Sequence, residues 1–221
     1  MKKNLLALAF LVGLLTCCKS EDAPIKPVKP TDPGSINKEY MSRAETTFAN
    51  IFKYYWSDKV RMMFGSYPNT LGTPQEPSSP DYDSHAYLWG LGSVVSAFNA
   101  IVQNTDNVDF RMTYESRLKE TLLKYYNTTK EPMCFGCFVN PHDQRLYDDA
   151  IWVGIDLADL YSKTKDSWYL DYAKSVWNFV LSGKDDELGG GVYWDENAKD
   201  SKNTCSNAPA VVLALKLYQI T

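Results

Sequence analysis

The chain has 221 residues, of which 44% are hydrophobic and 23% are charged. This length and balance suit one globular domain with a sizeable core, and they exclude a chain that is disordered throughout. The net charge of −4 argues against a nucleic-acid partner, because nucleic-acid binding favours a basic surface. Aromatic residues make up 14% of the chain. Such rings stack on sugars in binding clefts, although most rings of a domain fill its core.

The chain opens with the pattern of a bacterial export signal. Two lysines precede an apolar run at residues 5–15, which is too short to cross a bilayer as a stable helix. The run ends in Leu-Leu-Thr-Cys-Cys, which resembles a lipobox. We favour Cys18 over Cys17 as the lipidated residue, because Leu15 lies three positions before it. The alternative is a signal peptide that is cleaved without lipidation. Residues 1–18 are therefore expected to be a lipoprotein signal peptide.

Residues 19–37 are expected to form a tether. Proline recurs at every third position from Pro24 to Pro33, which favours a semi-extended chain. The Lys-Ser-Glu-Asp that follows Cys18 resembles the export signal of surface lipoproteins in Bacteroidetes. We therefore expect an exported protein at the outer membrane or cell surface, which touches the membrane only through its lipid anchor.

The remaining residues, 38–221, read as one domain in which apolar side chains recur at helical spacing. Asp166 or Ser167 is expected to cap the start of the fifth helix, and Gly183 to end it. The second and fourth helices are apolar around most of their circumference, whereas the third and fifth are amphipathic. This alternation predicts an all-α toroid of helical hairpins, with inner and outer helices. The helices are predicted at residues 38–56, 84–103, 109–127, 147–163 and 167–181, and from 208 onward.

Three cysteines lie in this domain, and the odd number excludes a complete set of disulfides. Cys134 and Cys137 have the C-x-x-C spacing, but the sequence offers no second ligand pair for zinc and no βαβ context for a redox motif. The third is Cys205. Neither His85 nor His142 stands at a metal-ligand spacing from a cysteine. We expect no metal ion and no other cofactor.

Two motifs distinguish this chain from a generic helical domain. Asp148 and Asp149 are followed, after two residues, by Trp152, and a run of three glycines leads into an aromatic pair at residues 189–194. In this order and spacing the motifs resemble glycoside hydrolase family 76, the endo-α-1,6-mannanases. The chain departs from the family at Val153, where a second tryptophan is frequent.

The resemblance implies an (α/α)6 toroid that hydrolyses α-1,6-mannosidic bonds of mannan with retention. It implies that Asp148 is the nucleophile and Asp149 the acid/base. A retaining glycosidase needs two carboxyls about 5–5.5 Å apart. Neighbouring aspartates can reach this separation at a helix start, where the backbone is free to aim both. Exposed amides there favour one ionised carboxylate, whose charge helps to keep its neighbour protonated. The alternative reading of the pair is capping of a solvated helix.

Further residues are candidates for contact with α-mannan or a related oligosaccharide. Trp152, one turn after the aspartates, is either a wall of the cleft or a core residue, whereas the rings after the glycines are better candidates for stacking. The polar residues before the second helix are expected at the rim of the cleft. In chain order the candidates are Asp83, His85, Trp152, Tyr193, Trp194 and Asn207.

An (α/α)6 toroid closes with six helical hairpins, and the sequence provides about three. We therefore expect about the first half of the toroid, incomplete at its C-terminus. Three interpretations stay open. The chain is an active mannanase completed by a second chain or by self-association, a non-catalytic glycan-binding lipoprotein, or an inactive truncated remnant.

Overall fold

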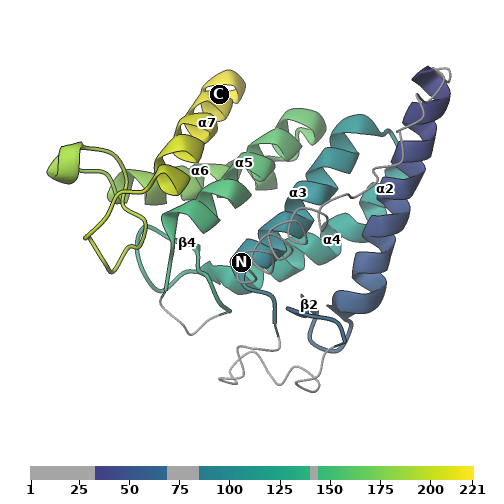
Figure 1. Ribbon diagram of the computed structural model, residues 1–221, viewed down its shortest axis with the longest axis horizontal. Coiled ribbons are helices and arrows are strands. Elements are labelled where there is room, and N and C mark those ends of the chain that lie inside the picture. The colour runs from purple at the N-terminus through teal and green to yellow at the C-terminus, as the bar shows by residue number, and fades with distance from the viewer. Residues whose placement is uncertain (1–32, 69–84, 140–143) are drawn as a thin grey trace, which may run out of the picture. The chain divides into compact units, whose positions relative to one another are not determined.

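The computed structural model describes residues 33–68, 85–139 and 144–221, and its compact domain comprises Glu39–Thr221 (Figure 1). The expected lipidation sites Cys17 and Cys18 lie outside the described residues, as does Asp83. The all-α prediction is confirmed. The described helices are α2 (Pro33–Tyr55), α3 (Leu88–Asn104), α4 (Val108–Tyr125), α5 (Tyr147–Thr164), α6 (Ser167–Ser182) and α7 (Thr204–Ile220). Within these ranges no helix is long and apolar enough to cross a membrane.

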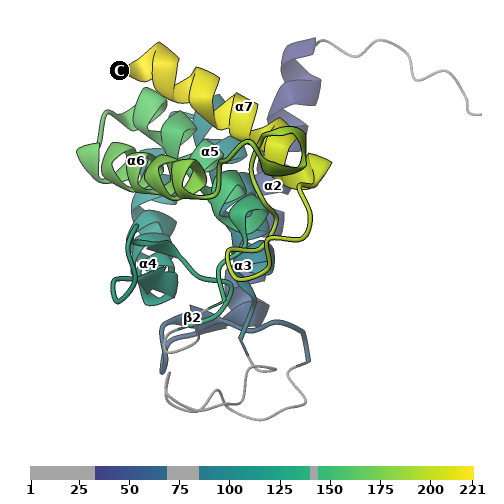
Figure 2. The same ribbon diagram turned by 90° about the vertical axis from the view of Figure 1, so that its left-hand side faces the viewer.

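Helices α3, α5 and α7 run parallel in one row, and α4 and α6 return behind them (Figures 1 and 2). The register between the helices shows the shared direction. A Cβ on Gly92 of α3 would lie 3.7 Å from Val153 of α5, and further along both helices Asn99 donates a hydrogen bond to Asp156. This row corresponds to the inner helices expected from the sequence, and α2, α4 and α6 correspond to the outer ones.

The connections at the two ends of the helices differ in length. Residues 105–107 and 165–166 join inner helices to outer ones, whereas the longer segments 56–87, 126–146 and 183–203 lead back to the inner helices. The start of every inner helix therefore lies at the end that carries the long connections. Loops held on a rigid scaffold are where binding and catalytic groups concentrate, so this end is the place to look for a site.

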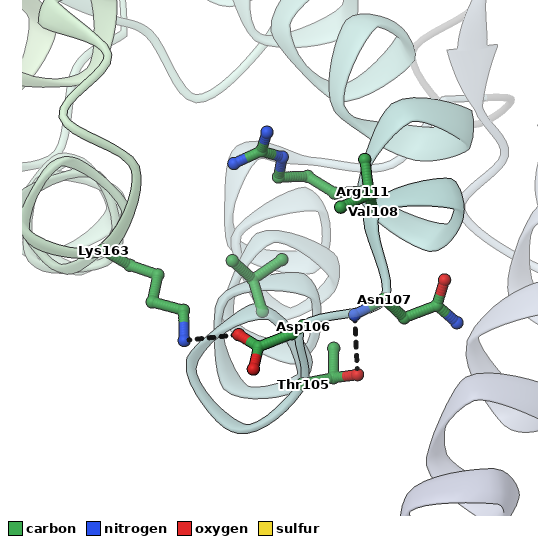
Figure 3. Close-up of a pocket in the computed structure, with 7 residues that line it drawn as sticks. Thr105, Asp106, Asn107, Val108, Arg111 and Lys163 are labelled. Atoms are coloured by element: carbon green, nitrogen blue, oxygen red, sulfur yellow. Dashed lines mark hydrogen bonds and ion pairs between the residues drawn. The ribbon is translucent and has the colours of Figure 1, made fainter.

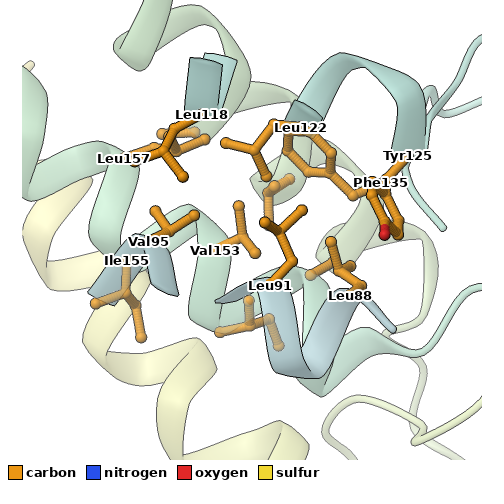
Figure 4. Packing of buried hydrophobic residues seen from close by; sticks show 14 of the residues in the cluster. Leu88, Leu91, Val95, Leu118, Leu122, Tyr125, Phe135, Val153, Ile155 and Leu157 are labelled. Carbon is orange, nitrogen blue, oxygen red and sulfur yellow. The ribbon is translucent and has the colours of Figure 1, made fainter. Parts of the chain in front are cut away.

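The core is formed by apolar side chains of the two rows (Figure 4). Gly154 of α5 lies where α5 packs on α6 and α7, because a Cβ there would lie 2.9 Å from Val176 of α6 and 3.1 Å from Leu213 of α7. A larger residue there would force the Val176 and Leu213 side chains to shift. The labelled core residues are Leu88, Leu91 and Val95 from α3, Leu118, Leu122 and Tyr125 from α4, Phe135, and Val153, Ile155 and Leu157 from α5.

Local signals for helix ends are confirmed at α6. The Asp166 carboxylate accepts a hydrogen bond from the Trp168 N–H at 3.0 Å, and Gly183 follows the last turn. Three predicted helix starts were wrong. Helix α3 begins at Leu88 rather than at residue 84. Helix α2 begins inside the predicted tether, at Pro33, because proline is well tolerated in a first turn. Helix α7 begins at Thr204 rather than at residue 208.

The connections contain short strands that the sequence did not predict. They pair as β1 (Trp56–Ser57) with β2 (Met62–Met63) and β3 (Tyr126–Asn127) with β4 (Cys134–Phe135). Each strand has two residues, which is too short for an alternating pattern to appear in the sequence. The segment after the glycines forms only single bridges, and it follows a 3-10 turn at Glu187–Gly189.

Candidate active site at the start of helix α5

Asp148 and Asp149 stand in the first turn of α5, and both are buried, with 8% and 9% of their surface exposed. The capping position belongs to Leu146, whose side chain makes no capping hydrogen bond. The two aspartates therefore neither cap the helix nor face bulk solvent, which overturns the alternative reading of the pair. Trp194 Nε1–H donates to Asp148 Oδ2 at 3.3 Å. The other oxygen, Asp148 Oδ1, is buried and accepts no hydrogen bond from the described residues.

The main chain brings Trp194 to the aspartates. The Tyr147 N–H donates to the Trp194 carbonyl at 3.0 Å, and the Glu196 N–H donates to the Arg145 carbonyl at 3.3 Å. These bonds form a short antiparallel pairing, which we call the site ladder, between the segment before α5 and the segment after the glycine turn. The ladder ends at the first turn of α5, so it determines which side chain lies over Asp148.

Asn207 of α7 holds the glycine turn in place. Its Oδ1 accepts from the Val192 N–H at 2.8 Å, and its Nδ2 donates to the carbonyls of Val192 and Asn203, both at 2.9 Å. Gly191 has φ +87°, and a Cβ there would lie 2.4 Å from the Asn207 side chain. The amide of Asn207 is thus engaged with the backbone, so the prediction that it contacts substrate is replaced by a role in holding the turn that carries Trp194.

Tyr147 anchors the start of α5. Its ring stacks on Phe179 at a centroid distance of 4.3 Å and packs directly on Gly183, where a Cβ would lie 2.3 Å from the ring. The glycine predicted only as a helix stop therefore also makes room for this ring. Because Tyr147 is fixed on α6, the first turn of α5 and its two carboxyls have a fixed orientation.

The two carboxyls differ in their electrostatics. The pKa of Asp149 is raised to about 6, first because burial disfavours its charged form and second because the charge of Asp148 repels it. A hydrogen bond with the Cys137 thiol acts in the opposite direction and lowers the pKa of Asp149. Asp149 is therefore the carboxyl that keeps its proton up to about pH 6. A proton donor beside a second carboxyl is the pair that glycosidases use.

The cysteines of the domain are free thiols, and two of them lie next to the aspartates. Cys137 is buried beside Asp149, and burial raises the pKa of its thiol to about 12. Cys205 contacts Asp148, and burial followed by that contact raises its pKa. Both thus stay protonated at neutral pH. Within the part of the chain that the structure describes, no three His, Cys, Asp or Glu side chains are grouped to hold a metal ion.

The aromatic candidates differ in the exposed fraction of their side chains. Trp152, one turn after the aspartates and on their face of the helix, is 43% exposed, and Trp194 is 37% exposed. Both rings are open enough for a sugar to stack on. Tyr193 is 3% exposed, and its ring is covered by the ammonium groups of Lys199 and Lys202. It belongs to the core, so its prediction as a subsite residue is corrected. The reason is the alternation of an extended chain, which turns neighbouring side chains to opposite sides.

His85 lies at the same end of the molecule, in the segment before α3. With Tyr87 and Trp89 it lines a hollow of about 340 Å³. Burial lowers the pKa of His85, followed by the charge of Lys124, so its ring is neutral at neutral pH. The sequence did not reveal the exposed rings of Tyr87 and Trp89, because Trp89 falls within an apolar run that predicted a mostly buried helix.

A second pocket, of about 240 Å³, lies at the opposite end, where the short connection 105–107 meets the end of α5 (Figure 3). Lys163 and Asp106 form an ion pair of 3.5 Å across it. Neither aspartate of the pair lines this pocket.

A search among curated proteins gave no match. The chain is similar to the solved structure of a family 76 glycoside hydrolase from a bovine Bacteroides thetaiotaomicron strain, at 31% identity and a TM-score of 0.71, over 82% of this chain and 38% of that one. It is also similar to a family 76 mannosidase from Bacteroides thetaiotaomicron VPI-5482, at 25% identity and a TM-score of 0.69, over 83% of this chain and 49% of that one.

A third similar structure is an inactive variant of an α-1,6-mannanase from Salegentibacter sp. HEL1_6, with two consecutive aspartates replaced, in complex with α-1,6-mannotetraose. Its identity is 22% and its TM-score 0.58, over 82% of this chain and 45% of that one. The chain thus spans half or less of the length of each of these three proteins. The family model described as glycosyl hydrolase family 76 matches residues 39–221. The chain therefore belongs to glycosyl hydrolase family 76, and its helical hairpins have the (α/α)6 toroid fold.

Proposed function

We propose that this domain hydrolyses α-1,6-mannosidic linkages of mannan with retention of configuration. The observation that carries the proposal is the buried carboxyl pair at the start of α5, in which Asp149 has a pKa of about 6 beside Asp148. In the first step the Asp148 carboxylate attacks the anomeric carbon, while Asp149 gives its proton to the departing glycosidic oxygen. In the second step Asp149 takes a proton from water, which displaces Asp148 from the sugar.

The surroundings of the pair support these roles. Asp148 Oδ2 accepts a hydrogen bond from the Trp194 indole, which orients the carboxylate next to Asp149. The exposed rings of Trp152 and Trp194 flank the pair and would stack on the apolar faces of mannosyl units. In the Salegentibacter protein, replacement of two consecutive aspartates gives an inactive variant that holds α-1,6-mannotetraose. We assign the same class of substrate to this chain.

The test is an assay of hydrolysis on α-1,6-mannan and on α-1,6-mannotetraose. Released reducing ends measure the rate, and NMR identifies which anomer forms first. Asp148→Asn and Asp149→Asn should each abolish release. Asp156→Asn is the matched control, because Asp156 is a buried aspartate on the same helix that is bound to Ser96 and Asn99, away from the pair. Binding of mannotetraose without release by the wild-type chain would replace this proposal with a non-catalytic glycan-binding role.

We also propose that another chain packs on the face of α7 that the described helices leave exposed. Val211, Leu215 and Tyr218 stand on one face of this helix and are 61%, 57% and 82% exposed. An apolar stripe of this kind is covered in stable folds. Light scattering should detect a complex, and Leu215→Glu should dissolve it. A wild-type chain that is monomeric and folded when expressed alone would argue against this proposal.

Finally, we propose that the protein is exported and anchored by a lipid on Cys18. The lipobox-like sequence before Cys18 is the support, since residues 1–32 lie outside the described part of the chain. Metabolic labelling with a fatty acid in a bacterial host should mark the wild-type chain and fail for Cys18→Ala. Labelling that persists in Cys18→Ala but is lost in Cys17→Ala would move the anchor by one residue.

A further inference from the structure

Arg145 is the most deeply buried charged residue of the site region, and it stands three positions before Asp148. Its guanidinium is fully buried and pairs with the Glu196 carboxylate, donating from Nε at 2.8 Å and also from one terminal nitrogen. The other terminal nitrogen donates to the carbonyls of Lys130 at 3.1 Å and Pro132 at 2.6 Å. The group lies 4.7 Å from the centre of the Phe179 ring.

A buried ion pair of this kind adds little net stability to a fold. Taking two charges out of water costs about as much as their attraction returns, so apolar residues of the same volume often serve a fold as well. What the planar fork of an arginine adds is geometry, because two parallel hydrogen bonds to one carboxylate allow a single relative placement. The pair therefore fixes the relative placement of the two segments that carry Arg145 and Glu196.

The pair sits at one end of the site ladder. Main-chain bonding joins Arg145 to Glu196, and the ladder continues through the bridge of Leu146 with Asp195 to the bond between Tyr147 and Trp194. The next side-chain contact after the ladder is the bond from the Trp194 indole to Asp148. A slip of one residue would turn every side chain of one segment to the other side and remove the indole from Asp148.

We propose that Arg145 and Glu196 are positioning residues, which fix the register of the site ladder and so hold the Trp194 indole on Asp148. The catalytic consequence rests on the proposed glycosidase function, in which Asp148 is the nucleophile. Neither residue touches the reacting atoms. Their contribution is to keep Asp148 aimed, and a displacement of about 1 Å at a reacting group can lower a rate by as much as a hundredfold.

The experiment uses the indole N–H signal of Trp194, which is assigned by its loss in Trp194→Phe. Glu196→Gln keeps the shape of the side chain but weakens the fork. We expect it to shift the Trp194 signal and to lower kcat on mannotetraose roughly tenfold or more, with a much smaller change in KM. Arg145→Lys keeps the charge without the fork, so it should give the same two changes.

The matched control is Glu120→Gln. Glu120 accepts two hydrogen bonds from the Arg61 guanidinium, at 2.9 and 2.6 Å, far from the ladder in sequence. This variant should leave the Trp194 signal and kcat unchanged. If the wild-type chain hydrolyses nothing, the proposed function fails, but the Trp194 signal still tests the positioning role.

An unchanged Trp194 signal in folded Glu196→Gln protein would overturn the proposal. So would the unfolding of both Glu196→Gln and Arg145→Lys, judged by circular dichroism, because the pair would then serve the fold itself rather than the placement of Trp194. A shift of equal size in Glu120→Gln would overturn it as well, since the signal would then respond to any lost ion pair.

Discussion

Replacing Asp149 by asparagine should stabilise the domain at neutral pH while it removes the proposed acid/base. In the folded state burial and Asp148 raise the pKa of Asp149 from 3.8 to about 6. The carboxyl thus favours folding when it is protonated. Its contribution is fully present below about pH 4 and is lost as the pH rises through about 6. The shift of about two pH units corresponds to about 3 kcal/mol, at 1.36 kcal/mol for each unit.

The assay is urea unfolding of the wild-type domain and of Asp149→Asn at pH 4 and at pH 7.5. At pH 4 the carboxyl is almost fully protonated in the folded state, so the two proteins should differ little. At pH 7.5 Asp149→Asn should be more stable, and the difference between the two proteins should have grown by about 2–3 kcal/mol. All other titrating groups are common to both proteins, so their effects cancel. The exposed Asp171 of α6 provides the control, because Asp171→Asn removes no buried charge.

Two results would refute this reasoning. One is a stability difference between wild type and Asp149→Asn that does not change with pH. The other is a wild-type advantage that grows toward pH 7.5, which would mean that ionised Asp149 is stabilised by its surroundings. Asp148→Asn extends the test, because removing the neighbouring charge should lower the pKa of Asp149. The stability that the domain loses between pH 4 and pH 7.5 should then be smaller.

Three further outcomes are expected. On mannotetraose, kcat/KM should fall about tenfold per pH unit above about pH 6 as Asp149 ionises, and a rate that is flat to pH 8 would contradict this. Trp194→Phe removes the donor to Asp148 and should lower kcat roughly tenfold with an unchanged circular dichroism spectrum. Gly183→Ala places a Cβ 2.3 Å from the Tyr147 ring and should cost about 2–3 kcal/mol in urea unfolding, whereas equal stability would show that the ring can move.

The amino-acid sequence determined the helical framework. Helix formation depends on contacts three and four residues apart, so the apolar spacing of the chain revealed each helix, and the cap at Asp166 marked the start of α6. The resemblance to family 76 singled out Asp148 and Asp149, and the chain belongs to that family. Both pieces of information are local: a periodic pattern in the first case and a short motif in the second.

Only the tertiary structure decided what surrounds the two aspartates. The sequence does not reveal which of the neighbouring rings Tyr193 and Trp194 is buried. Tyr193 lies in the core, whereas the Trp194 indole donates a hydrogen bond to Asp148. Asn207 looked like a residue for substrate but holds the glycine turn. These roles depend on hydrogen bonds between residues that are 15 positions apart along the chain for Asn207 and 46 positions apart for Trp194. No periodicity within one segment encodes these pairings.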